Sequence, residues 1–159
     1  MEDAKRAGLE SLIERLQLAV ADMEQVRAAV LASRDTNEPQ LLGALETAIV
    51  VCYMRPFTGR YSLPRKYRPK CELHNQLKEA RGNLYAHMDH LPGRRAYVVS
   101  RDPEAGLYVF GMESQTRGLP SVTWEPALQL AECLRRRFNA DSIELAQKLN
   151  NANPEAFGD

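Results

Sequence analysis

The sequence predicts an all-α protein, a bundle of four to five helices with a small β-hairpin after the third helix. Apolar residues recur at helical intervals through most of the chain, and proline and glycine interrupt that pattern at only a few places. Two short β-prone runs also stand next to each other. At 159 residues, the chain suits one domain, residues 1–159.

We expect one long first helix over residues 2–33, a stretch without proline. Its apolar residues recur every three or four positions, as in an amphipathic helix that packs one face against a core. These residues are Leu9, Leu12, Leu16, Ala19, Met23, Val26 and Val30.

A short polar break separates the first helix from a second one, expected over residues 40–54. Thr36 or Asn37 is the expected N-cap, because a side-chain oxygen there can accept a hydrogen bond from the first turn. Pro39 suits that first turn, where its missing N–H costs nothing. Residues 48–52 are apolar nearly all round, so this helix should be the central, most buried one.

Residues 55–70 are expected to form a loop, because proline and glycine recur there. A third helix follows and should stop at Pro92. The β-prone runs 96–100 and 107–111 predict the hairpin. A last helix should start near residues 121–123 and start again at Asp141.

Composition limits the classes of function. Lys and Arg number 21, as do Asp and Glu, so nucleic-acid binding would need a local basic patch. The three cysteines lack a disulfide-like spacing, the beginning of the chain resembles no signal peptide, and no apolar run approaches the length of a membrane span. We therefore expect a cytoplasmic protein without contact to a membrane. Phosphate-loop, dinucleotide and zinc-protease motifs are missing, so no cofactor is expected.

The third helix carries an Arg and a His beside its apolar stripe. Around the helix, Arg81 lies about 60° to one side of Leu84 and His87 about 60° to the other side. Along the axis they are roughly 9 Å apart, so one copy of the helix does not easily bring them together. A second copy packed across a two-fold axis would.

Arg81, five intervening residues and His87, in the context Tyr-Ala-His-Met-Asp, resemble the R-x5-H motif of the HEPN superfamily. The similarity extends upstream to residues 52–59, 63–64 and 73–74, as in the abortive-infection branch. It implies a HEPN-like helical bundle that acts as a homodimer and a metal-independent endoribonuclease on single-stranded RNA. It also implies a bacterial toxin–antitoxin or phage-defence setting, with an antitoxin or defence-system partner.

The chemistry of the pair fits that activity. A neutral His87 imidazole can take the proton from a ribose 2′-hydroxyl, while Arg81 stabilises the charge that grows on the phosphate. Asn83, one turn before His87, can orient the imidazole or bind a phosphate. The alternative is a hydrogen-bonded His87 in the helix seam and a solvated Arg81.

One position departs from the family pattern. Active members commonly carry Asn or Asp directly after the Arg, whereas this chain has Gly82, with Asn83 one residue further on. The departure favours a second hypothesis, a non-catalytic HEPN module that binds RNA or a protein partner.

The loop at residues 55–70 is basic and contains no acidic residue. Its aromatic residues Phe57, Tyr61 and Tyr67 alternate with cations, a mixture typical of single-stranded nucleic-acid binding. Tyr85, one turn after Arg81, is a further candidate for stacking on a base or on the Arg itself. The alternative is a solvated charged loop. The candidate RNA-binding cations are Arg55, Arg60, Arg65, Lys66 and Arg68, followed by Lys70.

Two further patterns receive structural interpretations. Residues 135–137 form a run of arginines that would complement the dipole at a helix C-terminus. Cys71 with His74, and His87 with His90, imitate a zinc-ligand spacing. On one helix, however, His74 and His87 lie about 20 Å apart, too far to share a metal. No metal site is expected.

Overall fold

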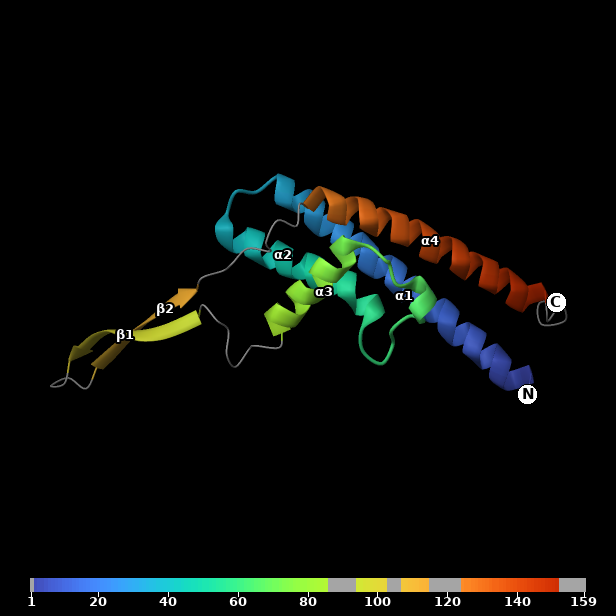
Figure 1. Cartoon of the computed structure of the whole chain (residues 1–159), viewed down its shortest axis with the longest axis horizontal. Coiled ribbons are helices and arrows are strands. Elements are labelled where there is room, and N and C mark those ends of the chain that lie inside the picture. The colour runs from blue at the N-terminus through green and yellow to red at the C-terminus, as the bar shows by residue number, and fades with distance from the viewer. Residues whose placement is uncertain (1, 86–93, 103–106, 115–123, 152–159) are drawn as a thin grey trace, which may run out of the picture.

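The structure, a computed structural model of the chain, describes residues 2–85, 94–102, 107–114 and 124–151, with side chains at residues 3–82 and 124–151 (Figure 1). Helices dominate these residues, which confirms the predicted all-α class. The helices are α1 (Glu2–Arg34), α2 (Pro39–Met54), α3 (Glu72–Tyr85) and α4 (Trp124–Asn151).

The long helices α1 and α4 run antiparallel, side by side along most of their length (Figure 1). Arg34 near the end of α1 meets Glu125 at the start of α4, whereas Gln17 in the first half of α1 meets Ser142 in the second half of α4. Their shared seam is apolar and buried. The buried apolar residues of the two helices include Leu16, Ala19, Met23, Val26 and Val30 of α1 and Ala127, Ala131, Leu134 and Phe138 of α4.

α1 is the central helix, because it packs against both α4 and α2. The sequence suggested α2 for that position. The apolar second half of α2 is indeed buried, at Ile49, Val50 and Cys52, but α2 packs against α1 and α3 and has no extensive contact with α4 in the described residues. The reason is length, since α1 offers two long seams and α2 is half as long.

The start of α2 differs in detail from the expectation. Pro39 opens the helix, as predicted, but the N-cap is Glu38, whose side chain makes no capping hydrogen bond. The Thr36 hydroxyl instead accepts a hydrogen bond from the Glu38 N–H at 3.2 Å. Neither Thr36 nor Asn37 is therefore the cap, because the helix begins one residue later than an Asn37 cap requires and two residues later than a Thr36 cap requires.

The segment between α2 and α3 is folded onto the core. It contains two short 3₁₀ helices, Arg55–Phe57 and Arg65–Tyr67, and a turn at Gly59, whose φ of 80° lies in the left-handed region that favours glycine. The side chains of Phe57, Leu63 and Tyr67 are buried. This segment is therefore anchored by its apolar residues.

α4 is continuous through Asp141, so the predicted second start there is wrong. Ser142 takes part in the helix contact instead: its hydroxyl accepts a hydrogen bond from Gln17 and donates one to the Asn139 carbonyl. Residues 135–137 consequently lie in the middle of α4, and their predicted role at a helix C-terminus is also wrong.

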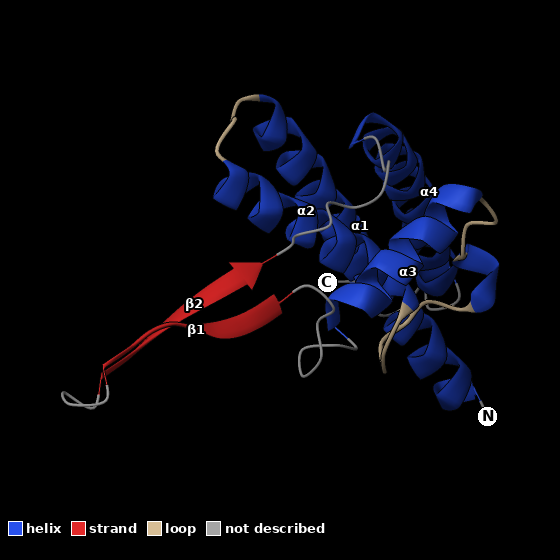
Figure 2. Cartoon of the chain, turned by 60° about the vertical axis from the view of Figure 1, so that its left-hand side comes forward, coloured by secondary structure: helices blue, strands red, loops and turns tan. Residues whose placement is uncertain are grey.

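Two strands, β1 (Arg94–Asp102) and β2 (Leu107–Ser114), form an antiparallel pair in which Arg94 faces Ser114. The register shifts between Val98 and Ser100. In both views the pair extends away from the helices (Figures 1 and 2). None of the helices that the structure describes is long and apolar enough to span a membrane.

The aromatic contact between α4 and the segment 55–67 gives a stability prediction. The Phe138 ring lies 6.3 Å from that of Phe57 and 6.0 Å from that of Tyr67, measured between centroids. We expect Phe138→Ala to lower the free energy of unfolding by about 3–5 kcal/mol, because it leaves a cavity where the segment meets α4. Urea denaturation followed by circular dichroism measures this change.

Ile143 on the same helix supplies the control, since 48% of its surface is exposed. Ile143→Ala should change the free energy of unfolding by about 0.5 kcal/mol or less. Equal effects of the two substitutions would contradict the packing described here.

Candidate nucleic-acid interface

Helix α3 positions Arg81 at the edge of a buried stripe. Leu77 and Ala80 face α2 and are buried, Leu73 is half-buried, and Arg81 is partly exposed next to them. The stripe expected from the sequence is thus present in the described part of α3. Arg81 lies where the helical wheel placed it, beside the seam.

The other residues of the expected catalytic site are described less fully. Asn83 and Tyr85 belong to the last turn of α3, and their side chains lie outside the described residues. His87 lies outside the described residues altogether. Whether Arg81 and His87 converge therefore stays a prediction.

Gly82 has room for a side chain. A Cβ placed on Gly82 would meet no described atom within 4 Å, apart from the helix's own backbone and its two neighbours. Close approach of another backbone is one of the usual reasons for a glycine in a helix, and nothing described approaches this one. The departure from the family pattern is therefore not imposed by packing in the described part of the protein.

Arg55, the first cation of the basic segment, already has a carboxylate partner. Its Nη1 lies 2.6 Å from Oδ1 of Asp22 on α1, whose side chain is only 9% exposed. Burial raises the pKa of the Asp22 carboxyl, and the Arg55 charge partly offsets that effect. Arg55 thus joins α1 to the end of α2.

Sequence reasoning missed Asp22, although a signal was available. The residue lies between Ala19, Met23 and Val26 of the apolar stripe, where a carboxylate is unexpected. A buried carboxylate requires a cation, but the sequence could not indicate which one.

The remaining cations of the segment are exposed. Arg60, Arg65 and Lys66 form no ion pair with a carboxylate in the described residues, and the Arg68 guanidinium donates to the Phe57 carbonyl at 3.3 Å. Lys66 Nζ lies 4.9 Å from the centroid of the Tyr67 ring. These side chains are available to an anionic ligand at the surface.

Two of the three rings expected to stack on bases are unavailable. Phe57 and Tyr67 are buried against Phe138, because folding the segment onto the core requires their apolar surface. Tyr61 is 70% exposed and is the ring of this segment that a base can reach.

A buried polar pair lies beneath the segment. The Tyr53 hydroxyl and Nδ1 of His74 share a hydrogen bond of 3.0 Å, and the Phe57 ring meets the His74 ring edge-on. Burial lowers the pKa of His74, with smaller contributions from Arg68 and Lys78. His74 therefore joins α3 to α2 as a neutral residue.

No metal site accompanies these residues. Within residues 3–82 and 124–151, no group of three or more His, Cys, Asp or Glu side chains is arranged to hold a metal ion. Nδ1 of His74 is hydrogen-bonded to the Tyr53 hydroxyl, whereas Cys71 is exposed.

Comparison of the chain with known protein families, curated proteins and solved structures gives no match. A functional assignment therefore depends on the residues and their geometry alone.

The buried His74 gives a pH prediction. Because its pKa is lowered in the folded protein, the unfolded chain binds a proton more readily. As the pH falls below about 6.5, the ordinary pKa of histidine, the free energy of unfolding should fall until the pH reaches the lowered value. Urea denaturation at several pH values from about 7.5 downward measures this dependence.

The matched variant is His74→Gln, which keeps a hydrogen-bonding side chain but cannot titrate. Its free energy of unfolding should depend less on pH than that of the wild type in the same window, because all other titrating groups are shared. Identical pH dependence of the two proteins would rule out His74 as a source of acid sensitivity.

Proposed function

We propose that this chain is a cytoplasmic HEPN-type RNA-binding domain in which Arg81 and His87 form a metal-independent endoribonuclease site between two identical subunits. The observation that carries the proposal is the motif itself, an Arg at the edge of a buried helix stripe followed after five residues by a His. The all-α fold agrees with it. A HEPN-like bundle, with the β1–β2 hairpin following α3, is part of the same proposal.

The position of the basic segment supports RNA as the ligand. Lys70 precedes the first residue of α3 by two positions, so exposed cations and Arg81 belong to one continuous stretch of chain. Along α3, Arg81 is about 14 Å from Glu72. Phosphates bound by the segment would therefore lie within a short length of strand from Arg81.

In the proposed reaction the neutral His87 imidazole accepts the proton of a ribose 2′-hydroxyl. The 2′-oxygen then attacks the adjacent phosphorus, and the bond to the 5′-oxygen of the next nucleotide breaks. The leaving oxygen takes a proton from the His87 of the second subunit or from water. The products are a 2′,3′-cyclic phosphate and a 5′-hydroxyl, and DNA is spared because it lacks the 2′-hydroxyl.

The other site residues have supporting roles in this proposal. Arg81 binds the non-bridging phosphate oxygens, which gain charge in the transition state. Asn83 orients the imidazole of His87, and Tyr85 stacks on a base. Two subunits are required because Arg81 and His87 of one helix are separated by roughly 9 Å along its axis.

Gly82 favours a second candidate function. A HEPN module that retains the Arg and His but lacks the usual polar residue would bind RNA, or an antitoxin or defence-system partner, without cleavage. The two functions differ in whether RNA is cut.

Substitution of the pair separates enzyme from binder. We expect Arg81→Ala and His87→Ala each to reduce cleavage of single-stranded RNA by about 10²-fold or more, the size typical of electrostatic and acid–base contributions. Lys78→Ala removes an exposed cation from the same helix and should leave cleavage close to the wild-type rate. EDTA should have no effect. Gel analysis of end-labelled RNA measures the rates and identifies the cyclic phosphate.

The same assay addresses Gly82. Since no described atom would lie within 4 Å of a Cβ there, apart from the helix's own backbone and the two neighbours, Gly82→Asn should fold normally, and it should raise cleavage if the site is weakened by the missing polar group. Wild-type protein that binds diverse RNAs and cuts none of them would decide for the non-catalytic module.

Dimerisation is the second requirement of the enzyme. Light scattering at micromolar protein should give about twice the 17.9 kDa mass of the chain, as two-fold dimers are the commonest oligomers. A monomer at high concentration would remove the shared site.

A further inference from the structure

Most cations of residues 55–70 form no ion pair with a described carboxylate. Arg55 is paired with Asp22, but the other cations of the segment form no ion pair with a described Asp or Glu. Glu144 lies near Lys66, but its lowered pKa comes mainly from its hydrogen bond to Lys148. The unpaired cations are Arg60, Arg65, Lys66, Arg68 and Lys70.

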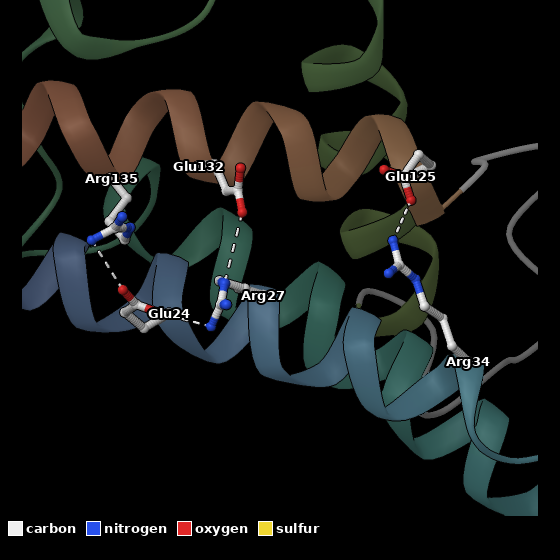
Figure 3. A network of polar contacts seen from close by, with 6 residues as sticks. All are labelled: Glu24, Arg27, Arg34, Glu125, Glu132 and Arg135. Carbon is white, nitrogen blue, oxygen red and sulfur yellow. Dashed lines mark hydrogen bonds and ion pairs between the residues drawn. The ribbon is translucent and has the colours of Figure 1, made fainter.

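The exposed edge of the α1–α4 contact differs from this segment. Along the exposed edge of the α1–α4 contact, each of three arginines has a glutamate (Figure 3). Arg27 pairs with Glu132, and the other pairs are Arg34 with Glu125 and Arg135 with Glu24. The zero net charge of the chain thus conceals a separation between a neutralised edge and a positive segment.

Neighbouring helices add two more cations to the segment. Arg15 of α1 donates to the Ser62 carbonyl at 3.2 Å, and Arg137 of α4 donates to the Lys66 carbonyl at 3.0 Å. A carbonyl oxygen carries no net charge. These hydrogen bonds therefore hold the segment in place and leave the guanidinium charges available.

Two of the cations lie near the same aromatic ring. Lys66 Nζ lies 4.9 Å and Arg137 Cζ 5.5 Å from the centroid of the same Tyr67 ring. Tyr67 is buried against Phe138, so both cations lie near a ring that is anchored in the core.

We propose that these cations form one composite surface that binds the phosphate backbone of single-stranded RNA. Tyr61, exposed beside them, provides a ring for a base, and a groove of cations with a free aromatic ring is typical of single-strand binding. The inference rests on RNA as the proposed ligand but is independent of cleavage. The composite surface consists of Tyr61 and the cations Arg15, Arg60, Arg65, Lys66, Arg68, Lys70 and Arg137.

The test measures RNA binding by the His87→Ala protein, so that cleavage cannot interfere. A labelled single-stranded RNA of about 20 nucleotides, longer than the site of a small single-strand-binding domain, is titrated by fluorescence anisotropy at several salt concentrations. Substitution of Arg65, Lys66 and Arg137 by Gln should weaken binding. The slope of log K against log salt should become shallower by about 0.7 for each lost phosphate contact, or about 2 in all.

A matched control removes the same charge from the paired edge and from α1. Arg6, Arg27 and Arg34 are exposed and each has a glutamate partner, so Gln at these positions lowers the net charge equally. This control should keep the wild-type salt slope. An equal loss of slope in both triple variants would overturn the composite surface in favour of overall charge.

Two substitutions of Arg137 distinguish a phosphate contact from a purely structural hydrogen bond. Arg137→Lys keeps the cation and should bind RNA nearly as the His87→Ala parent does, whereas Arg137→Gln should bind more weakly. An equal loss of RNA affinity in the two variants would overturn the phosphate contact. Arg137 would then serve only to hold the Lys66 backbone through its hydrogen bond. Thermal unfolding shows that each variant is folded.

Failure of this inference is distinguishable from failure of the enzyme. RNA binding with an unchanged slope in the triple Gln variant overturns the composite surface, whether or not the wild type cuts RNA. A shallower slope in the triple Gln variant, together with a wild type that cuts no RNA, supports the surface and overturns the endoribonuclease. Binding to phosphatidylserine vesicles but not to RNA would overturn RNA as the ligand.

Discussion

The antiparallel contact between α1 and α4 is the interaction on which the rest of the structure depends. It joins two helices separated by residues 35–123 and buries apolar side chains of both, among them Leu16 of α1 and Phe138 of α4. The ion pairs along its exposed edge contribute little each, because exposed pairs are screened by water. The apolar seam therefore provides the stability. α2 packs on the opposite side of α1, and the basic segment lies across α1 and α4.

Buried polar residues determine how the other elements attach to this pair. Asp22 binds Arg55 at the end of α2, the Tyr53 hydroxyl binds His74 of α3, and Ser142 binds Gln17 across the α1–α4 contact. A buried polar group without a partner costs about 1–3 kcal/mol. A shift of any of these helices along its neighbour would break one such contact, so each pair favours a single arrangement.

The segment 55–70 connects the fold to the proposed function. Its apolar side chains, Phe57, Leu63 and Tyr67, are part of the core, and its cations are at the surface. Arg15 and Arg137 donate hydrogen bonds to backbone carbonyls of the segment. These bonds hold its backbone in place without neutralising the positive charges. A preorganised cationic surface loses less entropy on binding than a mobile loop does. The fold thus makes a sequence of ordinary net charge suitable for an anionic ligand.

The sequence by itself determined the helices, since apolar periodicity and proline positions reflect local geometry. It also placed Arg81 beside a buried stripe and identified the cations of residues 55–70. Only the tertiary structure decided which helix is central, that Arg55 forms an ion pair with Asp22, and that Phe57 and Tyr67 are core residues. These outcomes depend on contacts between residues far apart in the chain. Periodicity within one element cannot specify such partners, because each stripe is compatible with several neighbours.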